Sequence, residues 1–206
     1  MTSHTTTAGG HGRARRQSCA LVVIILAVAS LAQARAAGEE SRSEVVVHEA
    51  RGVYTVAARF TVPHAQEIAH AVLTDYEQIP RFMPDVKTSV VRERSEGRAV
   101  VEQQAVSRVM MFSKRVHLLL EVSERRDAVR FRDASGQSFT EYEGAWLLSE
   151  HDGETTISYQ LRANPSFAVP EFLLRQLFRK DATRMIGRLR TEIAARSHVT
   201  STLAPR

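Results

Sequence analysis

The chain has 206 residues, of which 43% are hydrophobic and 25% are charged. This composition is ordinary for a folded globular protein, and the length suits one hydrophobic core better than two full-sized domains. Four of the 28 Lys and Arg residues, but none of the 23 Asp and Glu residues, lie before position 37. The rest of the chain is therefore nearly neutral, which gives no electrostatic support for nucleic-acid binding.

The first 36 residues have the pattern of a secretory signal peptide. Arg13, Arg15 and Arg16 precede an apolar run over residues 20–32, and small residues follow that run. The run is shorter than the roughly 20 residues that a membrane-spanning helix needs. We therefore expect an exported protein, periplasmic or associated with the cell envelope. An uncleaved membrane anchor is the alternative.

The only cysteine, Cys19, lies in the segment that is expected to be removed. The mature protein would then have no disulfide, no thiol nucleophile and no thiolate metal site. Residues 37–43 are small and polar, which is typical of a flexible leader. We expect one domain over residues 44–196, followed by a disordered tail over residues 197–206.

The first half of this domain begins with a strand and continues with helices. Apolar residues alternate strictly from Tyr54 to Val62, which predicts a half-buried strand. Helical spacing follows from Pro63 to about Thr74. Because prolines interrupt that spacing, residues 76–85 are expected to form a second short helix or a tight irregular segment.

The second half of the domain has strand periodicity up to about residue 163, with Gly-containing turns such as Ser135-Gly136 and Asp152-Gly153. An apolar stripe at helical spacing then predicts a long helix over residues 170–196, roughly 40 Å at 1.5 Å per residue. These elements predict an α+β fold in which a curved antiparallel sheet wraps around the long C-terminal helix. Two short helices should follow the first strand.

Four short segments carry a family likeness: residues 74–86 (TDYEQIPRFMPDV), 112–116 (FSKRV), 142–146 (YEGAW) and 170–174 (PEFLL). They resemble the polyketide cyclase/dehydrase family of the START-like (SRPBCC) superfamily, which also contains coenzyme Q-binding START-domain proteins. The resemblance extends over residues 44–196. It implies the helix-grip fold, with a deep apolar cavity between the sheet and the long helix.

Acid-base catalysis would need a carboxylate or a histidine inside such a cavity. The candidates are Asp75, Glu102, His117, Asp133, Glu141 and Glu143. His117, Glu141 and Glu143 alternate out of phase with apolar or aromatic neighbours, which favours the outer face of the sheet, and Asp75 suits a helix end. We therefore assign no catalytic residue. No metal-binding or phosphate-binding motif occurs, so no cofactor is expected.

Apolar side chains are better candidates for ligand binding, since methionine and aromatic residues conform to irregular apolar ligands. We expect eight of them to line or gate a cavity: Phe82, Met83, Met111, Phe112, Tyr142, Trp146, Phe167 and Phe178. For each of them, a place in a packed core is the alternative interpretation.

Three functions fit these patterns. The first is non-catalytic binding or transport of a hydrophobic small molecule, a lipid, quinone or polyketide-like compound by resemblance. The second is an aromatase/cyclase-like enzyme, and the third is an envelope protein with a filled core that acts through interactions. The final helix also carries a basic side, which is expected to be a solvated face or a site of transient contact with a membrane surface: Arg175, Arg179, Lys180, Arg184 and Arg188. The oligomeric state stays open.

Overall fold

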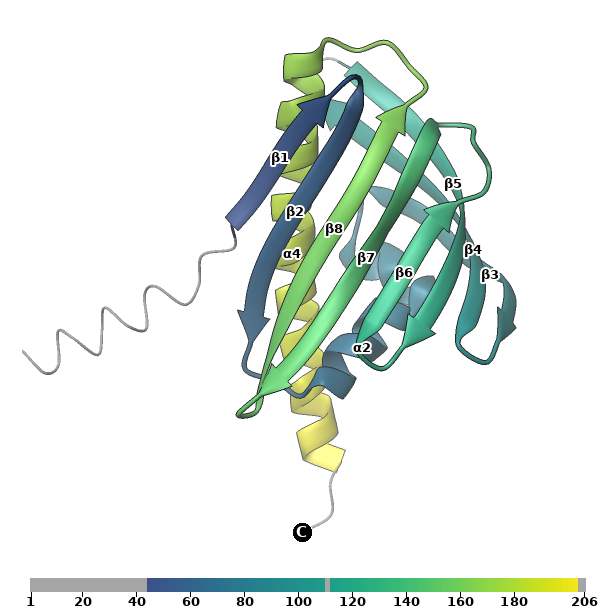
Figure 1. The fold of residues 1–206 in the computed structure, drawn as a ribbon. Helices are drawn as coiled ribbons and strands as arrows, with labels where there is room; N and C mark the ends of the chain where they lie inside the picture. Colours follow the sequence, from purple (N-terminus) through teal and green to yellow (C-terminus); the bar gives the residue numbers. More distant parts are fainter. Residues whose placement is uncertain (1–43, 110–111, 204–206) are drawn as a thin grey trace, which may run out of the picture. The chain divides into compact units, whose positions relative to one another are not determined.

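The fold is α+β, and its central feature is one antiparallel sheet curved around a long helix (Figure 1). The computed structural model describes residues 44–109 and 112–203. The strands are β1 (Glu44–Ala50), β2 (Val53–Val62), β3 (Val86–Ser95), β4 (Arg98–Val109), β5 (Phe112–Arg125), β6 (Ala128–Asp133), β7 (Phe139–His151) and β8 (Glu154–Pro165). The helices are α2 (Gln66–Thr74), the 3₁₀ helix η1 (Tyr76–Gln78), α3 (Ile79–Phe82) and α4 (Glu171–Leu203).

The strand order is β1-β2-β8-β7-β6-β5-β4-β3. The strands from β3 to β8 form a meander, and the β1–β2 hairpin joins it because β2 pairs with β8. The short helices α2, η1 and α3 connect β2 to β3. The long helix α4 runs along the concave face of the sheet (Figure 1). The helix-grip fold expected from the sequence is thereby confirmed.

Strand β2 shows how alternation in the sequence becomes a core. Its residues Tyr54, Val56, Ala58, Phe60 and Val62 are all buried, and the residues between them face outward. Because successive side chains of a strand point to opposite faces, one face of β2 belongs to the core under α4.

The sequence analysis missed the strand β1, so the short helices follow the second strand of the sheet and not the first. The hairpin turn between β1 and β2 has positive φ at both Arg51 and Gly52. The Gly52 amide donates a hydrogen bond to the Glu49 side chain, 2.8 Å away. Positive φ at both central residues is typical of a type I′ turn, but Arg-Gly is a weaker signal than Asn-Gly or Asp-Gly.

Two helix ends differ from the sequence-based expectation. Helix α2 begins at Gln66 and not at Pro63, because the Gln66 amide donates to Glu150 (2.8 Å) and the Gln66 side chain donates to the Arg126 carbonyl (2.7 Å). Helix α4 continues to Leu203, so the expected disordered tail is wrong for residues 197–203. Arg196 supports this extension through ion pairs with Asp75 (2.7 Å) and Glu192 (2.9 Å).

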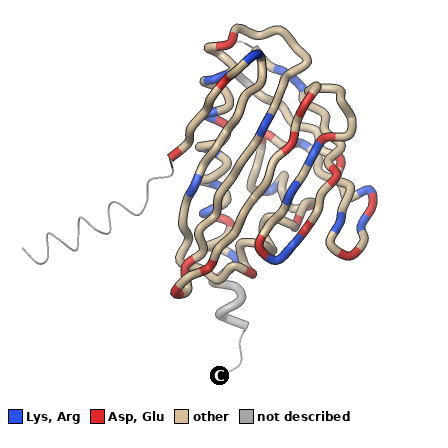
Figure 2. The backbone as a smooth tube through the Cα atoms, viewed as in Figure 1, with Lys and Arg blue, Asp and Glu red and all other residues tan. Residues whose placement is uncertain are grey.

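The outer face of the sheet carries charges of both signs. Figure 2 shows Lys and Arg mixed with Asp and Glu over the strands in view. Ion pairs between neighbouring strands join Arg132 to Glu121 (2.6 Å) and Arg162 to Glu141. Exposed pairs of this kind contribute about 0.2–1 kcal/mol each. The ion pair with the exposed Arg162 places Glu141 on the side of the sheet away from α4.

Gly144 in β7 permits the tight curvature of the sheet at β6, β7 and β8. A methyl group at this position would lie 2.4 Å from the Gln160 carbonyl oxygen and 2.6 Å from the Phe131 ring. Glycine within a strand often marks such a close approach. The ring of Phe131 can therefore lie over the backbone of β7 only because residue 144 has no side chain.

We expect the Gly144→Ala substitution to destabilise the fold by about 1–3 kcal/mol, because the added methyl group overpacks the Phe131 contact. Gly187→Ala is the matched control, since a methyl group there has no neighbour within 4 Å. It should be neutral or stabilise the helix by about 0.5–1 kcal/mol. Chemical denaturation of the two variants measures both effects, and equal stabilities would contradict the packing argument.

Candidate ligand cavity

A cavity of about 330 Å³ lies between the concave face of the sheet and α4. Its volume is at the lower end of the roughly 300–1,000 Å³ typical of small-molecule sites. The interior wall is mainly aliphatic and aromatic, with contributions from β2, β5, β6, β7 and β8: Val56, Leu118, Leu120, Val122, Val129, Phe131, Trp146 and Leu161. Helix α4 forms the opposite wall with Leu174, Leu177, Phe178, Ala182, Met185 and Leu189.

Six of the eight side chains expected to line or gate a cavity do lie on its wall: Phe82, Met83, Tyr142, Trp146, Phe167 and Phe178. Met111 lies outside the described residues. Phe112 begins β5, but its side chain also lies outside the described part. That these side chains bind a ligand stays a prediction.

Aromatic contacts hold several of these side chains in place. The ring centroids of Phe139 and Tyr142 are 4.8 Å apart, and those of Trp146 and Tyr159 are 4.4 Å apart. A register shift in β7 between Phe139 and Glu141 turns Phe139 onto the face of Tyr142. Strict alternation along β7 would instead place Phe139 on the same face as Glu141.

Two tyrosine hydroxyl groups on the cavity wall have no hydrogen-bond partner within the described part of the chain, those of Tyr142 and Tyr159. Burial raises the pKa of Tyr142 to about 12 and raises the pKa of Tyr159 well above its ordinary value. Both hydroxyls therefore stay protonated at neutral pH. They are available as hydrogen-bond donors to a molecule in the cavity.

A polar group that the sequence analysis missed lies on α4. The Asp181 carboxylate accepts a hydrogen bond from the Ser107 hydroxyl (3.2 Å) and another from the Arg184 guanidinium. Arg184 also contacts Asp85 at 3.3 Å. Asp181, Ser107, Arg184 and Asp85 all line the cavity. This set is called the polar cluster below.

Burial raises the pKa of the Asp181 carboxyl group, and the hydrogen bonds from Arg184 and Ser107 oppose that shift. The side chain keeps 39% of its surface accessible, and it borders a cavity with mainly apolar walls. Desolvation is therefore the dominant effect.

Two residues of the basic side of α4, Arg184 and Arg188, also border the cavity. Arg188 is exposed at the same time, as expected of a solvated face. Arg188 donates a hydrogen bond to the Phe82 carbonyl, 3.1 Å away. Arg179 and Lys180 are exposed, as expected of a solvated face.

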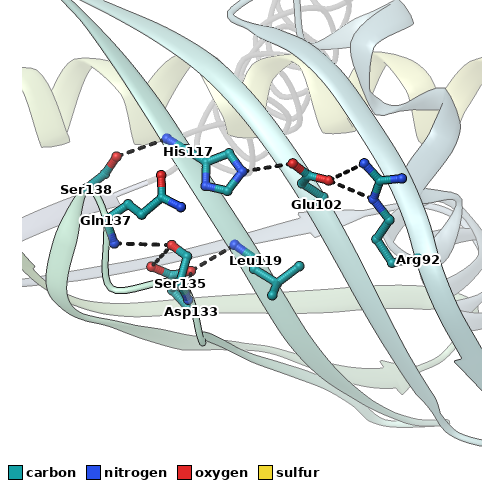
Figure 3. A network of polar contacts seen from close by, with 8 residues as sticks. All are labelled: Arg92, Glu102, His117, Leu119, Asp133, Ser135, Gln137 and Ser138. Atoms are coloured by element: carbon teal, nitrogen blue, oxygen red, sulfur yellow. Dashed lines mark hydrogen bonds and ion pairs between the residues drawn. The ribbon is translucent and has the colours of Figure 1, made fainter.

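The acid-base candidates from the sequence do not line the cavity. His117 contacts Glu102 at 2.9 Å, and Arg92 donates to the same carboxylate at 2.6 Å (Figure 3). The hydrogen bond from His117 lowers the pKa of Glu102, and Arg92 adds to that effect. The Ser138 hydroxyl accepts from the backbone amide of His117 and not from its ring (2.9 Å), so no Ser-His-Glu relay forms.

The remaining candidates have structural partners. Asp133 accepts hydrogen bonds from the Leu119 amide (2.8 Å) and the Ser135 amide (2.9 Å), which orders the loop after β6 (Figure 3). Glu143 lies on the outer face of the sheet, and Asp75 pairs with Arg196. Among the described residues, no three His, Cys, Asp or Glu side chains gather where they could hold a metal ion. The helices in that part of the chain are also too short or too polar to span a membrane.

Comparison with known proteins identifies the family. Residues 62–190 match the family model described as "Polyketide cyclase / dehydrase and lipid transport". The chain therefore belongs to this family. It includes both cyclase or aromatase enzymes and non-enzymatic lipid binders. No curated protein sequence gave a significant match.

Solved structures share the fold at low sequence identity. A STAR-related lipid transfer protein from Xanthomonas axonopodis is 15% identical, with a TM-score of 0.59 over 74% of this chain and 98% of that one. The Zhui aromatase/cyclase from Streptomyces sp. R1128 is 14% identical, with a TM-score of 0.60 over 70% and 96%. Human STARD10 is 12% identical, with a TM-score of 0.61 over 80% and 79%. These likenesses show the START-like fold.

The raised pKa of Asp181 gives a testable pH dependence. Because the folded state binds this proton more tightly than the unfolded state does, the wild type should gain stability relative to Asp181→Asn as the pH falls through the raised pKa. Thermal unfolding at pH 7 and pH 4.5 measures the difference between the two proteins. Asp127→Asn, in an exposed turn, is the control. If the stability of wild type relative to Asp181→Asn instead falls on acidification, folding stabilises the ionised form of the Asp181 carboxyl group.

Proposed function

We propose that this protein binds and carries a hydrophobic small molecule, a lipid, quinone or polyketide-like compound, in the cavity between the sheet and α4. The observation that carries the proposal is the cavity itself, with about 330 Å³ enclosed by mainly apolar walls. Cavities lined by apolar side chains with a few placed polar groups are typical of small-molecule sites. The cavity also argues against a protein with a filled core, because interiors normally pack without voids of this size.

The place of action is part of the proposal. The signal-peptide pattern of residues 1–36 supports an exported carrier in the periplasm or cell envelope. Exposed groups near the start of α4 would suit brief contact with a membrane surface during loading, since Phe172 is 70% exposed and Arg179 and Lys180 lie nearby in the sequence. Aromatic and basic side chains are the usual partners of a lipid interface.

A second candidate function is that of a cyclase-like enzyme, and the observation that favours it is Asp181. A carboxyl group with a raised pKa beside a cavity has the properties of a general acid or base. The buried Tyr142 and Tyr159 hydroxyls could hold a substrate carbonyl oxygen close to it. An enzyme would release an altered product, whereas a carrier returns the same molecule that it received.

We expect native mass spectrometry of the protein purified from its own envelope to show one apolar molecule per chain, which extraction and mass analysis identify. Ala105→Phe should abolish this occupancy, because residue 105 lines the cavity and the added ring fills part of it. Ala57→Phe makes the same change on an exposed outward-facing position of β2 and should keep the ligand. A ligand-free wild type that takes up neither lipids nor quinones would count against the carrier.

A further inference from the structure

One end of the cavity is polar, and the polar cluster defines what can bind there. Ser107 extends from β4, Asp85 precedes β3, and Asp181 and Arg184 lie one turn apart on α4. The contacts Ser107–Asp181 at 3.2 Å and Arg184–Asp85 at 3.3 Å link these three elements. The inference that follows rests on the proposed function, because it concerns the head group of the carried molecule.

The charged side chains on the cavity wall are balanced. Two are acidic, Asp85 and Asp181, and two are basic, Arg184 of the polar cluster and Arg188, which lies outside it. An anionic head group would lie against two carboxylates, and a cationic one would lie against two guanidinium groups. Either would be only partly compensated in a cavity that solvates charge poorly. A neutral head group avoids both costs.

The polar cluster offers hydrogen-bond acceptors on its two carboxylates and donors on the Arg184 guanidinium. Asp181 keeps 39% of its side-chain surface accessible, and its two oxygens have lone pairs beyond those used by Ser107 and Arg184. Arg184 uses one terminal nitrogen for both aspartates. Its guanidinium group carries further N–H donors.

We propose that the carried molecule has a neutral hydroxyl group, as an alcohol or a phenol, at this end of the cavity. The hydroxyl donates its hydrogen to Asp181, and its oxygen has lone pairs to accept from a terminal guanidinium nitrogen of Arg184 or Arg188 on the cavity wall. A carboxylate has no hydrogen to donate, and an ammonium group has no lone pair to offer Arg184. A hydroxyl is neutral, donates and accepts, and therefore matches all three properties of the polar cluster.

The test compares four ligands that share one hydrocarbon chain: dodecanol, dodecanoic acid, dodecylamine and dodecane. Each competes with an apolar fluorescent probe for the full mature protein at pH 7. On the wild type, dodecanol should bind at least about tenfold more tightly than each of the others, the size expected for one hydrogen bond to a charged group. Tighter binding of the acid or the amine, or equal binding of dodecanol and dodecane, would overturn the inference.

Variants assign the preference to Asp181. Asp181→Leu should remove the advantage of dodecanol over dodecane, and Gln176→Leu, at an exposed position of α4 that does not line the cavity, should keep it. Asp181→Asn is a second variant of nearly unchanged shape, and it should lower the advantage at least about threefold because a neutral acceptor is weaker. A preference that survives in both Asp181 variants overturns the inference.

The outcomes separate this inference from the proposed function. If all four ligands bind wild type equally well, the hydroxyl inference fails while the hydrophobic carrier stands. If the protein binds neither the apolar probe nor any of the four ligands, both fail together.

Discussion

The pairing of β2 with β8 is the constraint on which the rest of the structure depends. These strands are joined from Tyr54↔Ala163 to Val62↔Thr155, although the short helices and the strands β3 to β7 lie between them in the sequence. The pairing attaches the N-terminal hairpin to the meander and widens the sheet to eight strands. Helix α4 follows β8 and returns across the concave face (Figure 1). Because one helix cannot cover the concave face of so wide a curved sheet, a space remains, and this space is the cavity.

Local periodicity explains how much of this fold could be predicted from the sequence. The alternating apolar residues of β2 and the apolar stripe of α4 each indicate one buried face. One buried face is enough to predict whether a segment is a strand or a helix. Strand β1 was not predicted because it lies at the edge of the sheet. Val46 is half exposed there, and the alternation of buried and exposed residues is weak. The last part of α4 was not predicted because ion pairs of Arg196 with Asp75 and Glu192 stabilise it. Asp75 is remote from Arg196 in the sequence, so local periodicity does not indicate this contact.

The candidate site shows the same division between local and non-local information. Tyr142 and Trp146 could be assigned to the cavity because they share a face of β7. Asp181 was missed, although it lies within the apolar stripe, between Phe178 and Ala182. A charged residue at that place in a stripe was a usable signal. Its partner Ser107 could not be predicted from the sequence, because only folding brings β4 next to α4.

The polar groups of the cavity link ligand binding to folding. Asp181 is desolvated, and the hydroxyls of Tyr142 and Tyr159 lack partners in the described part of the chain. Each of these features lowers the stability of the empty protein relative to one with an apolar, filled core. A ligand that fills the cavity and bonds to these groups binds only the folded state, so it raises stability by RT ln(1 + [L]/Kd). Under the proposed function, the groups that weaken the empty fold are therefore the same groups that would select the ligand.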